Sequence, residues 1–144
     1  MTGAPSIASL VPHAGSMCLL ERVVAWDDAR VTVATSTHRD PDNPLARNGR
    51  LHAIHLCEYG AQAMAVHGGL LARSQGGRAQ AGMLVSLRDV ELQCDYVESL
   101  PGELDVEARR VHSTPASWQY EFRIMHAGRT LVQGRAIVSV VPDS

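Results

Sequence analysis

Apolar and polar positions alternate along much of this chain, and one long stretch breaks the alternation. The segments "RVTVATSTH" (30–38) and "LDVEARRVH" (104–112) place apolar and polar residues in turn, which is typical of half-buried β-strands. Residues 54–73 instead lack proline and are dominated by alanine, leucine and methionine, which favours a helix. The pattern therefore predicts strands on both sides of a single helix.

Other strands are expected where β-branched and aliphatic residues gather, at residues 17–26, 82–97, 117–128 and 129–141. Asp27-Asp28 and Ala127-Gly128 are turn signals, so the first two and the last two strands are expected to form hairpins. Residues 39–53 contain two prolines, two asparagines, two aspartates and a glycine, which predicts a loop. The order β-β-loop-α-β-β-β-β predicts one α+β domain over residues 1–144, with an antiparallel sheet of five to six strands wrapped around one central helix.

Composition narrows the classes of partner and compartment. The 144 residues are 45% hydrophobic and carry a formal net charge of −2, so a large core is expected and neither nucleic acid nor an anionic membrane is expected as partner. Three widely spaced cysteines, Cys18, Cys57 and Cys94, indicate a reducing compartment rather than a disulfide framework. We see neither a signal peptide nor an apolar run near the ~20 residues that span a bilayer. The expected location is the cytoplasm.

The central helix contains the first candidate site. Its apolar sequence is interrupted by Glu58 and Gln62, which share one stripe with His55 at spacings i, i+3 and i+7. Such a stripe either faces solvent or lines a substrate site. His52-x-x-His55 with Cys57 could suggest zinc, but Cys-x-x-Cys and His-Glu-x-x-His motifs are both missing, so no metal is expected. Cys57 could be a nucleophile, although a cysteine among Leu and Ala is more often part of the core.

Four motifs, in order, resemble the 3-hydroxyacyl-acyl-carrier-protein dehydratases. They are "LVPHAGSMCLLERVV" (10–24), "CEYGAQAMA" (57–65), "RDVEL" (88–92) and "SLPGEL" (99–104). Within that family, "PHAGSM", "HRDPDNPL" and "EYGAQAMAVHG" are most similar to the proteins of aryl polyene pathways. The resemblance covers nearly the whole chain and implies the hotdog fold.

The resemblance implies dehydration of a 3-hydroxyacyl thioester to a 2-enoyl thioester. The family glutamate and glutamine carry over to Glu58 and Gln62, and Gln62 is expected to orient Glu58. The Gly-His-Phe-Pro-Gly type motif that holds the family's catalytic base is missing. His38, which opens the loop in its place, is our first candidate for the base, and His13 is the second. His52 and His55 flank the start of the helix and stay as further alternatives.

The residues expected to line the substrate site are Asn43, Ala53, Ile54, His55 and Gln62. The start of the helix is expected to supply backbone N–H donors to the thioester oxygen. No cofactor is expected, because the substrate would arrive on the phosphopantetheine of acyl carrier protein or on CoA. Arg47, Arg50 and Arg88 could meet that carrier.

Two other functions stay open at this point. One is a hotdog acyl thioesterase, in which Glu58 would activate water. The other is a non-catalytic partner subunit of an active dehydratase. In either case the resemblance implies a homodimer or larger assembly, or a hetero-oligomer with another hotdog subunit.

Overall fold

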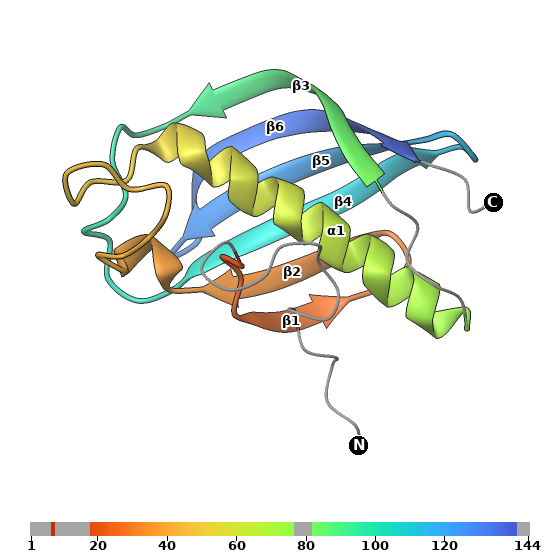
Figure 1. Cartoon of the computed structure of the whole chain (residues 1–144), viewed down its shortest axis with the longest axis horizontal. Helices are drawn as coiled ribbons and strands as arrows, with labels where there is room; N and C mark the ends of the chain where they lie inside the picture. Colours follow the sequence, from red (N-terminus) through yellow and green to blue (C-terminus); the bar gives the residue numbers. More distant parts are fainter. Residues whose placement is uncertain (1–6, 8–17, 77–81, 141–144) are drawn as a thin grey trace.

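The computed structural model describes residues 7, 18–76 and 82–140, which form a curved sheet around one long helix (Figure 1). In chain order the elements are β1 Arg22–Trp26, β2 Arg30–Thr35, the 3-10 turns η3 Thr37–Arg39 and η4 Ala53–His55, the helix α1 Leu56–Ser74, β3 Gly82–Leu92, β4 Leu104–Ser113, β5 Ser117–His126 and β6 Arg129–Val140. The strands described here pair antiparallel in the order β1-β2-β4-β5-β6-β3. The order of strands and helix along the chain is the one that the sequence predicts.

The predicted boundaries differ most where side chains, rather than a strand ladder, hold the backbone. The first strand begins at Arg22 rather than at residue 17, because the N–H and carbonyl of Leu19 are bound by side chains of other elements. The second strand ends at Thr35 and turns into η3, and the third ends at Leu92 rather than at residue 97.

Both predicted hairpins are present. β1 pairs with β2, and the turn is closed by Asp27, whose carboxylate accepts hydrogen bonds from the N–H groups of Ala29 and Arg30. β5 pairs with β6 through Ala127-Gly128, where both residues have positive φ, 50° and 79°. Two consecutive residues with positive φ are the geometry of the tightest hairpin turns.

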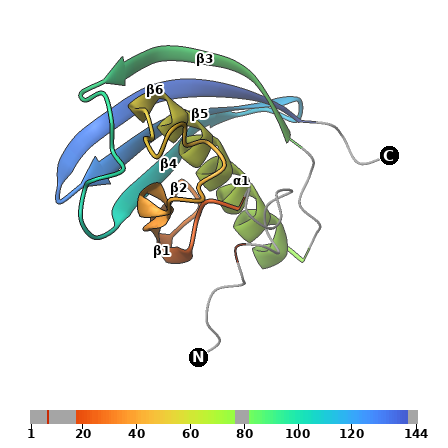
Figure 2. The ribbon, with the colours of Figure 1, turned by 60° about the vertical axis from the view of Figure 1, so that its left-hand side comes forward.

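The core lies between α1 and the concave face of the sheet (Figure 2). The helix packs mainly on β2, β4, β5 and η4. The helix comes close to the sheet at Gly60, where a Cβ atom would lie 2.7 Å from the ring of Phe122 on β5. The same ring lies against Gly134 of β6. Glycine is therefore required at both positions for the phenylalanine to fit between helix and sheet.

The strand β3 forms one edge of the sheet and leaves apolar side chains uncovered. Met83, Leu84, Val85 and Leu87 are 41 to 63% exposed. A long apolar edge strand is a surface onto which another chain can add. Among the described residues, neither α1 nor the 3-10 turns have the length and hydrophobicity that are needed to cross a membrane.

Candidate active site

The helix start is a continuous run of helical backbone from η4 into α1. The imidazole of His52 caps it, because Nδ1 accepts a hydrogen bond of 3.1 Å from the N–H of Ile54. The N–H of Ala53 donates to the carbonyl of Asp95, that of His55 to the carbonyl of His52, and that of Leu56 to the carbonyl of Ala53. The first four donors of this run therefore already have acceptors. The prediction that they are available to a thioester oxygen is wrong for this conformation.

Glu58 lies in the first turn of α1 and is half-buried. Gln62, one turn later, donates from Nε2 to a carboxylate oxygen of Glu58 over 3.4 Å, the long end of the hydrogen-bonding range. The Oε1 atom of Gln62 accepts a 2.9 Å hydrogen bond from the N–H of Leu19. That second bond fixes which end of the amide faces Glu58, so the amide presents a donor to the carboxylate.

Leu19 is itself clamped from the other side. Its carbonyl accepts hydrogen bonds of 2.6 Å from the hydroxyls of Thr35 and Thr37. The segment that leads into β1 is therefore bound to the helix by its N–H and to the end of β2 by its carbonyl. This arrangement joins the surroundings of Glu58 to three segments far apart in the sequence.

Tyr59 forms a second polar connection beside Glu58. Its hydroxyl is 2.9 Å from Oγ1 of Thr37 and 2.9 Å from Nδ2 of Asn43. The Asn43 amide also donates to the carbonyl of Thr37 and accepts from the N–H of Leu45. Asn43 is buried, and these bonds tie the loop to the helix. Its predicted role in substrate binding stays a prediction.

His38, in η3, is only 1% exposed. Its Nε2 lies 2.9 Å from the carbonyl of Leu100, which can only accept, so Nε2 carries the proton. Nδ1 is then a lone-pair acceptor, and it is buried without a hydrogen-bond partner. Burial is the main cause that lowers the pKa of His38 and keeps the ring neutral, with a smaller opposing contribution from the Leu100 carbonyl. A neutral ring with a free acceptor nitrogen has the chemistry of a base.

The remaining predicted site residues are spread around the helix start. Ala53 is buried, Ile54 is 45% exposed, and His55 is half-buried at the first turn. His13 lies outside the described residues. Burial raises the pKa of the Cys57 thiol, which disfavours the thiolate form that a nucleophile would need.

The three arginines considered as carrier contacts have different surroundings. Arg50 stacks over the ring of Tyr96 at 3.6 Å and is 3.7 Å from a carboxylate oxygen of Glu98. Arg47 donates to backbone carbonyls of its own loop. Arg88 is exposed on β3. In the part of the chain that is described, no three His, Cys, Asp or Glu side chains are grouped to hold a metal ion.

Residues 5–144 match the ApeP-like family, described as ApeP dehydratase. The chain belongs to the ApeP-like dehydratase family. This confirms the sequence resemblance to the hotdog dehydratases of aryl polyene pathways. A comparison with curated proteins finds no match.

Solved structures confirm the hotdog fold of this ApeP-like chain. The dehydratase heterocomplex ApeI:P from Xenorhabdus doucetiae matches with a TM-score of 0.87 at 24% identity, over 97% of this chain and 93% of that chain. AziG from S. sahachiroi matches with a TM-score of 0.65 at 18% identity, over 93% and 99%. A mutant of thioesterase PA1618 from Pseudomonas aeruginosa matches with a TM-score of 0.62 at 18% identity, over 85% and 81%. At these identities the likeness concerns the fold alone.

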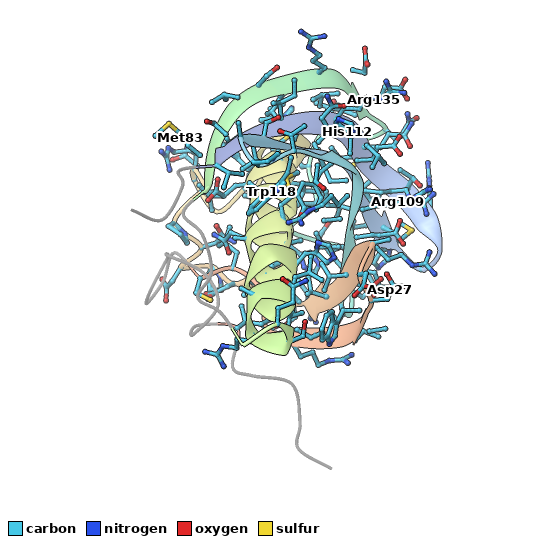
Figure 3. The ribbon with its side chains drawn as sticks, turned by 90° about the vertical axis from the view of Figure 1, so that its right-hand side faces the viewer. Asp27, Met83, Arg109, His112, Trp118 and Arg135 are labelled. Carbon is cyan, nitrogen blue, oxygen red and sulfur yellow. The ribbon has the colours of Figure 1, made fainter. Side chains whose placement is uncertain are left out.

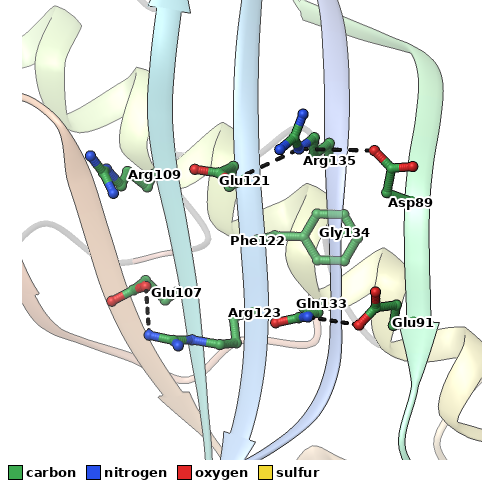
Figure 4. A pocket seen from close by; sticks show the side chains of 10 residues that line it. All are labelled: Asp89, Glu91, Glu107, Arg109, Glu121, Phe122, Arg123, Gln133, Gly134 and Arg135. Carbon is green, nitrogen blue, oxygen red and sulfur yellow. Dashed lines mark hydrogen bonds and ion pairs between the residues drawn. The ribbon is translucent and has the colours of Figure 1, made fainter.

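A cavity of about 500 Å³ lies on the outer face of the sheet, away from the helix (Figure 4). Five of its charged side chains pair across the strands: Arg135 with Asp89 and Glu121, and Arg123 with Glu107. Because opposite charges alternate from strand to strand, this surface is already compensated. We therefore place the candidate active site of this ApeP-like chain at Glu58 and not in this cavity.

Sequence reasoning missed two groups of polar residues in this ApeP-like chain. The first is Tyr59 with Thr37, which has no motif of its own. The second, in the other half of α1, joins His67, Tyr120 and Arg110. His67 is fully buried. Arg110 could have been found from the alternation of β4, since it continues the buried row of Val106 and Ala108.

Proposed function

We propose that this chain removes water from a 3-hydroxyacyl thioester, carried on the phosphopantetheine of acyl carrier protein or on CoA, and releases the 2-enoyl thioester. Membership of the ApeP-like dehydratase family supports the reaction class. The observation that carries the proposal is the half-buried carboxylate of Glu58, which is bound by an amide that Leu19 fixes in turn.

The reaction needs one group to accept a proton from C2 and another to give a proton to the hydroxyl on C3. We assign the second task to Glu58. Its carboxyl group gives a proton to the leaving hydroxyl, the C3–O bond breaks, and water forms. The electron pair left at C2 closes the double bond. The donor from Gln62 stabilises the carboxylate that Glu58 becomes.

We assign the proton of C2 to Nδ1 of His38. Two features support this choice: the unpartnered lone pair and the proton held on Nε2 by the carbonyl of Leu100. Because the ring is covered, the substrate would have to displace what lies over it. His13 is the alternative base. Return of the proton from His38 to Glu58, directly or through water, restores the starting state.

The test is an assay by mass spectrometry on purified protein with 3-hydroxyacyl-acyl-carrier-protein thioesters. We expect loss of one water by the wild type, and a decrease of about 10²- to 10⁴-fold in Glu58→Gln. Glu107→Gln is the matched control, because Glu107 is also half-buried but lies on the outer face of the sheet. Equal activity of Glu58→Gln and wild type would contradict the assignment.

Other products would point to the other functions. Release of free carrier thiol would identify a thioesterase. Inactivity of the wild type alone, with activity restored by a second hotdog protein, would identify a partner subunit. For the base, His38→Gln with unchanged turnover and an unchanged melting temperature would move the role to His13.

We further propose that the chain works as a dimer of two copies joined through β3. The uncovered apolar residues of that edge strand support this, since soluble monomers normally protect such edges. Light scattering is expected to show a dimer for the wild type and a monomer for Val85→Lys. Val24→Lys is the control, because Val24 is similarly exposed, at 51% against 55%, but lies on the opposite edge strand β1. A dimer that survives Val85→Lys, or a wild type that pairs only with a different hotdog chain, would contradict the proposal.

A further inference from the structure

Arg110 is an arginine on the inner face of the sheet. Along β4 the side chains of Leu104, Val106 and Ala108 are buried and alternate with outward-facing residues. Arg110 continues this inner row and pairs in register with the buried Tyr120 of β5. A β-bulge follows directly, between Arg110 and His112. Bulges of this kind re-aim side chains and often accompany functional sites.

The guanidinium of Arg110 is only partly satisfied by the protein. Its Nε donates to the hydroxyl of Tyr120 over 3.0 Å, and its central carbon lies 4.1 Å from the ring centre of Trp118. The Nη2 atom is buried and has no hydrogen-bond partner. In the described residues no carboxylate forms an ion pair with Arg110. Buried donors on a charged group normally have an acceptor, so an acceptor from outside these residues is expected.

The tyrosine does not serve as that acceptor for Nη2, because its oxygen accepts from Nε and Nη2 forms no hydrogen bond. Nε2 of His67 is 3.0 Å from the carbonyl of Asp27 and must carry the proton. Nδ1 of His67, 2.8 Å from the tyrosine oxygen, therefore accepts from the hydroxyl. The protons of His67 and Tyr120 in these bonds therefore all have acceptors. Nη2 of Arg110 is the buried donor that lacks one.

Trp118 and Arg110 face the same part of the helix. A Cβ atom on Gly68 would lie 3.6 Å from the Trp118 ring and 3.8 Å from Nη2 of Arg110, and a Cβ on Gly82 would lie 3.6 Å from the same ring. Trp118 thus reaches both α1 and the start of β3. In Figure 3, Trp118 lies against the helix whereas Arg109 points away from it.

Gly68 is half-buried, as Glu58 is, and lies roughly 80° around the helix from it. The two residues are ten positions apart, so they are separated by roughly 15 Å along the helix axis. Glu58, where we place the reacting end of the substrate, and the unsatisfied donor of Arg110 are therefore near opposite ends of the helix, about a quarter turn apart around its axis.

We propose that Arg110 and Trp118 bind the far end of the acyl chain and select chains that end in an oxygen acceptor, a carboxylate before a hydroxyl before a methyl group. The terminal oxygen accepts from Nη2, and the indole ring packs against the last methylene groups. This inference rests on the proposed function only for the placement of the thioester at Glu58.

The test is equilibrium binding of pantetheine amides of saturated acids, which can be neither dehydrated nor hydrolysed. Three amides of equal length would end in a carboxylate, a hydroxyl or a methyl group, and the series would be repeated at increasing chain length. In a Trp26→Phe background Trp118 is the single tryptophan, since the chain has two, and its fluorescence reports occupancy. The carboxylate-ended amide is expected to bind about tenfold more tightly than the methyl-ended one, as one charge-assisted hydrogen bond would give.

Arg110→Met is expected to abolish that preference, because a thioether side chain keeps the volume without the donor. Arg109→Met is the matched control, being the neighbouring residue on the outer face, and it should keep the preference. Equal binding of the three amides by the wild type, no binding of any, or a preference that survives Arg110→Met would overturn the proposal. If Arg110→Met instead changed only the oligomeric state, Arg110 would be an interface residue and the proposal would fail. Because no turnover is measured, failure of the dehydratase assay leaves this result independent.

Discussion

The two halves of α1 both connect to the sheet through buried polar side chains, but the connections differ in kind. In the first half, Gln62 and Tyr59 bind backbone and hydroxyl groups of segments before and after β2, and a half-exposed carboxylate stands beside them. In the second half, His67 and Tyr120 are enclosed and their protons all have acceptors, whereas Nη2 of the neighbouring Arg110 has none. The first half leaves a carboxyl group partly exposed, and in the second half the histidine uses both ring nitrogens in hydrogen bonds.

The comparison shows how burial and connectivity separate a reactive group from a structural one. Both His38 and His67 are almost fully buried and have a lowered pKa, with burial as the main cause. His67 uses both ring nitrogens in hydrogen bonds, whereas His38 uses one. The free nitrogen, and not the burial, is what makes His38 a candidate base.

The strongest test of this difference is a pair of matched tyrosine variants. Tyr59 and Tyr120 are both fully buried in the helix–sheet core. Tyr120→Phe leaves Nε of Arg110 and Nδ1 of His67 without partners, so we expect a loss of roughly 2–4 kcal/mol in the free energy of unfolding. Tyr59→Phe leaves Thr37 bound to Leu19 and Asn43 bound to Thr37, so about 1 kcal/mol is expected.

Urea denaturation of the two variants measures both values. Equal losses would mean that the two networks are energetically alike. In addition, Tyr120→Phe should remove one tyrosine ionisation from the strongly alkaline range, because burial raises the pKa of Tyr120 to about 12. Ultraviolet titration of the folded protein is the check.

A pair of helix glycines gives the next largest effect. A Cβ atom at Gly60 would overlap the Phe122 ring, whereas one at Gly68 would make ordinary contacts of 3.6 Å or more. Gly60→Ala is therefore expected to destabilise by about 1–3 kcal/mol through overpacking. Gly68→Ala should stabilise by about 0.5–1 kcal/mol, because alanine is the better helix former. Thermal melts with the same sign for both variants would contradict this packing.

Acid dependence of stability gives the smallest effect. The folded-state pKa of His67 lies below its ordinary value of 6.5. The unfolded chain therefore takes up the proton more readily, so stability is complete above that value and falls as the pH drops below it. Each such histidine contributes a slope of at most about 1.4 kcal/mol per pH unit, and His38 acts in the same direction.

His67→Leu should flatten the slope of unfolding free energy against pH between neutral and mildly acidic conditions. The charged groups that influence His67 are Asp27 and Arg110, and both remain in this variant. His112→Leu is the control for replacement of a histidine by leucine, because His112 is exposed on β4. A slope that His67→Leu does not alter would place the acid sensitivity elsewhere.

The order of elements could be predicted because periodicity and turn residues are local properties. The Ala-rich helix, the strict alternation of β4 and the Ala127-Gly128 turn all form where their own residues favour them. The ends of β1 and β3 could not be predicted in the same way. Leu19 has strand propensity, but side chains from α1 and β2 bind its peptide groups, and no local signal shows this.

The same distinction between local patterns and long-range contacts applies to the residues of the candidate site. Glu58 and Gln62 were recognisable because helical spacing places them one turn apart and they interrupt an apolar helix. The contact of His38 with Leu100 and the bond between Asn43 and Tyr59 could not be predicted, because the two residues of each pair are 62 and 16 positions apart. The alternation of β4 could have placed Arg110 on the inner face of the sheet. The missing acceptor of its Nη2 atom is visible only in the folded structure, where the neighbouring strands and the helix surround it.

The double attachment of Leu19 gives the protein a mechanical linkage. The peptide groups of Leu19 join the amide of Gln62 to the hydroxyls of Thr35 and Thr37. A movement of one of these groups therefore affects the others. A displacement of the segment that leads into β1 would rotate the amide of Gln62 and move its Nε2 donor away from Glu58. The orientation of that carboxyl group would then depend on a segment whose own sequence contains none of the reacting atoms.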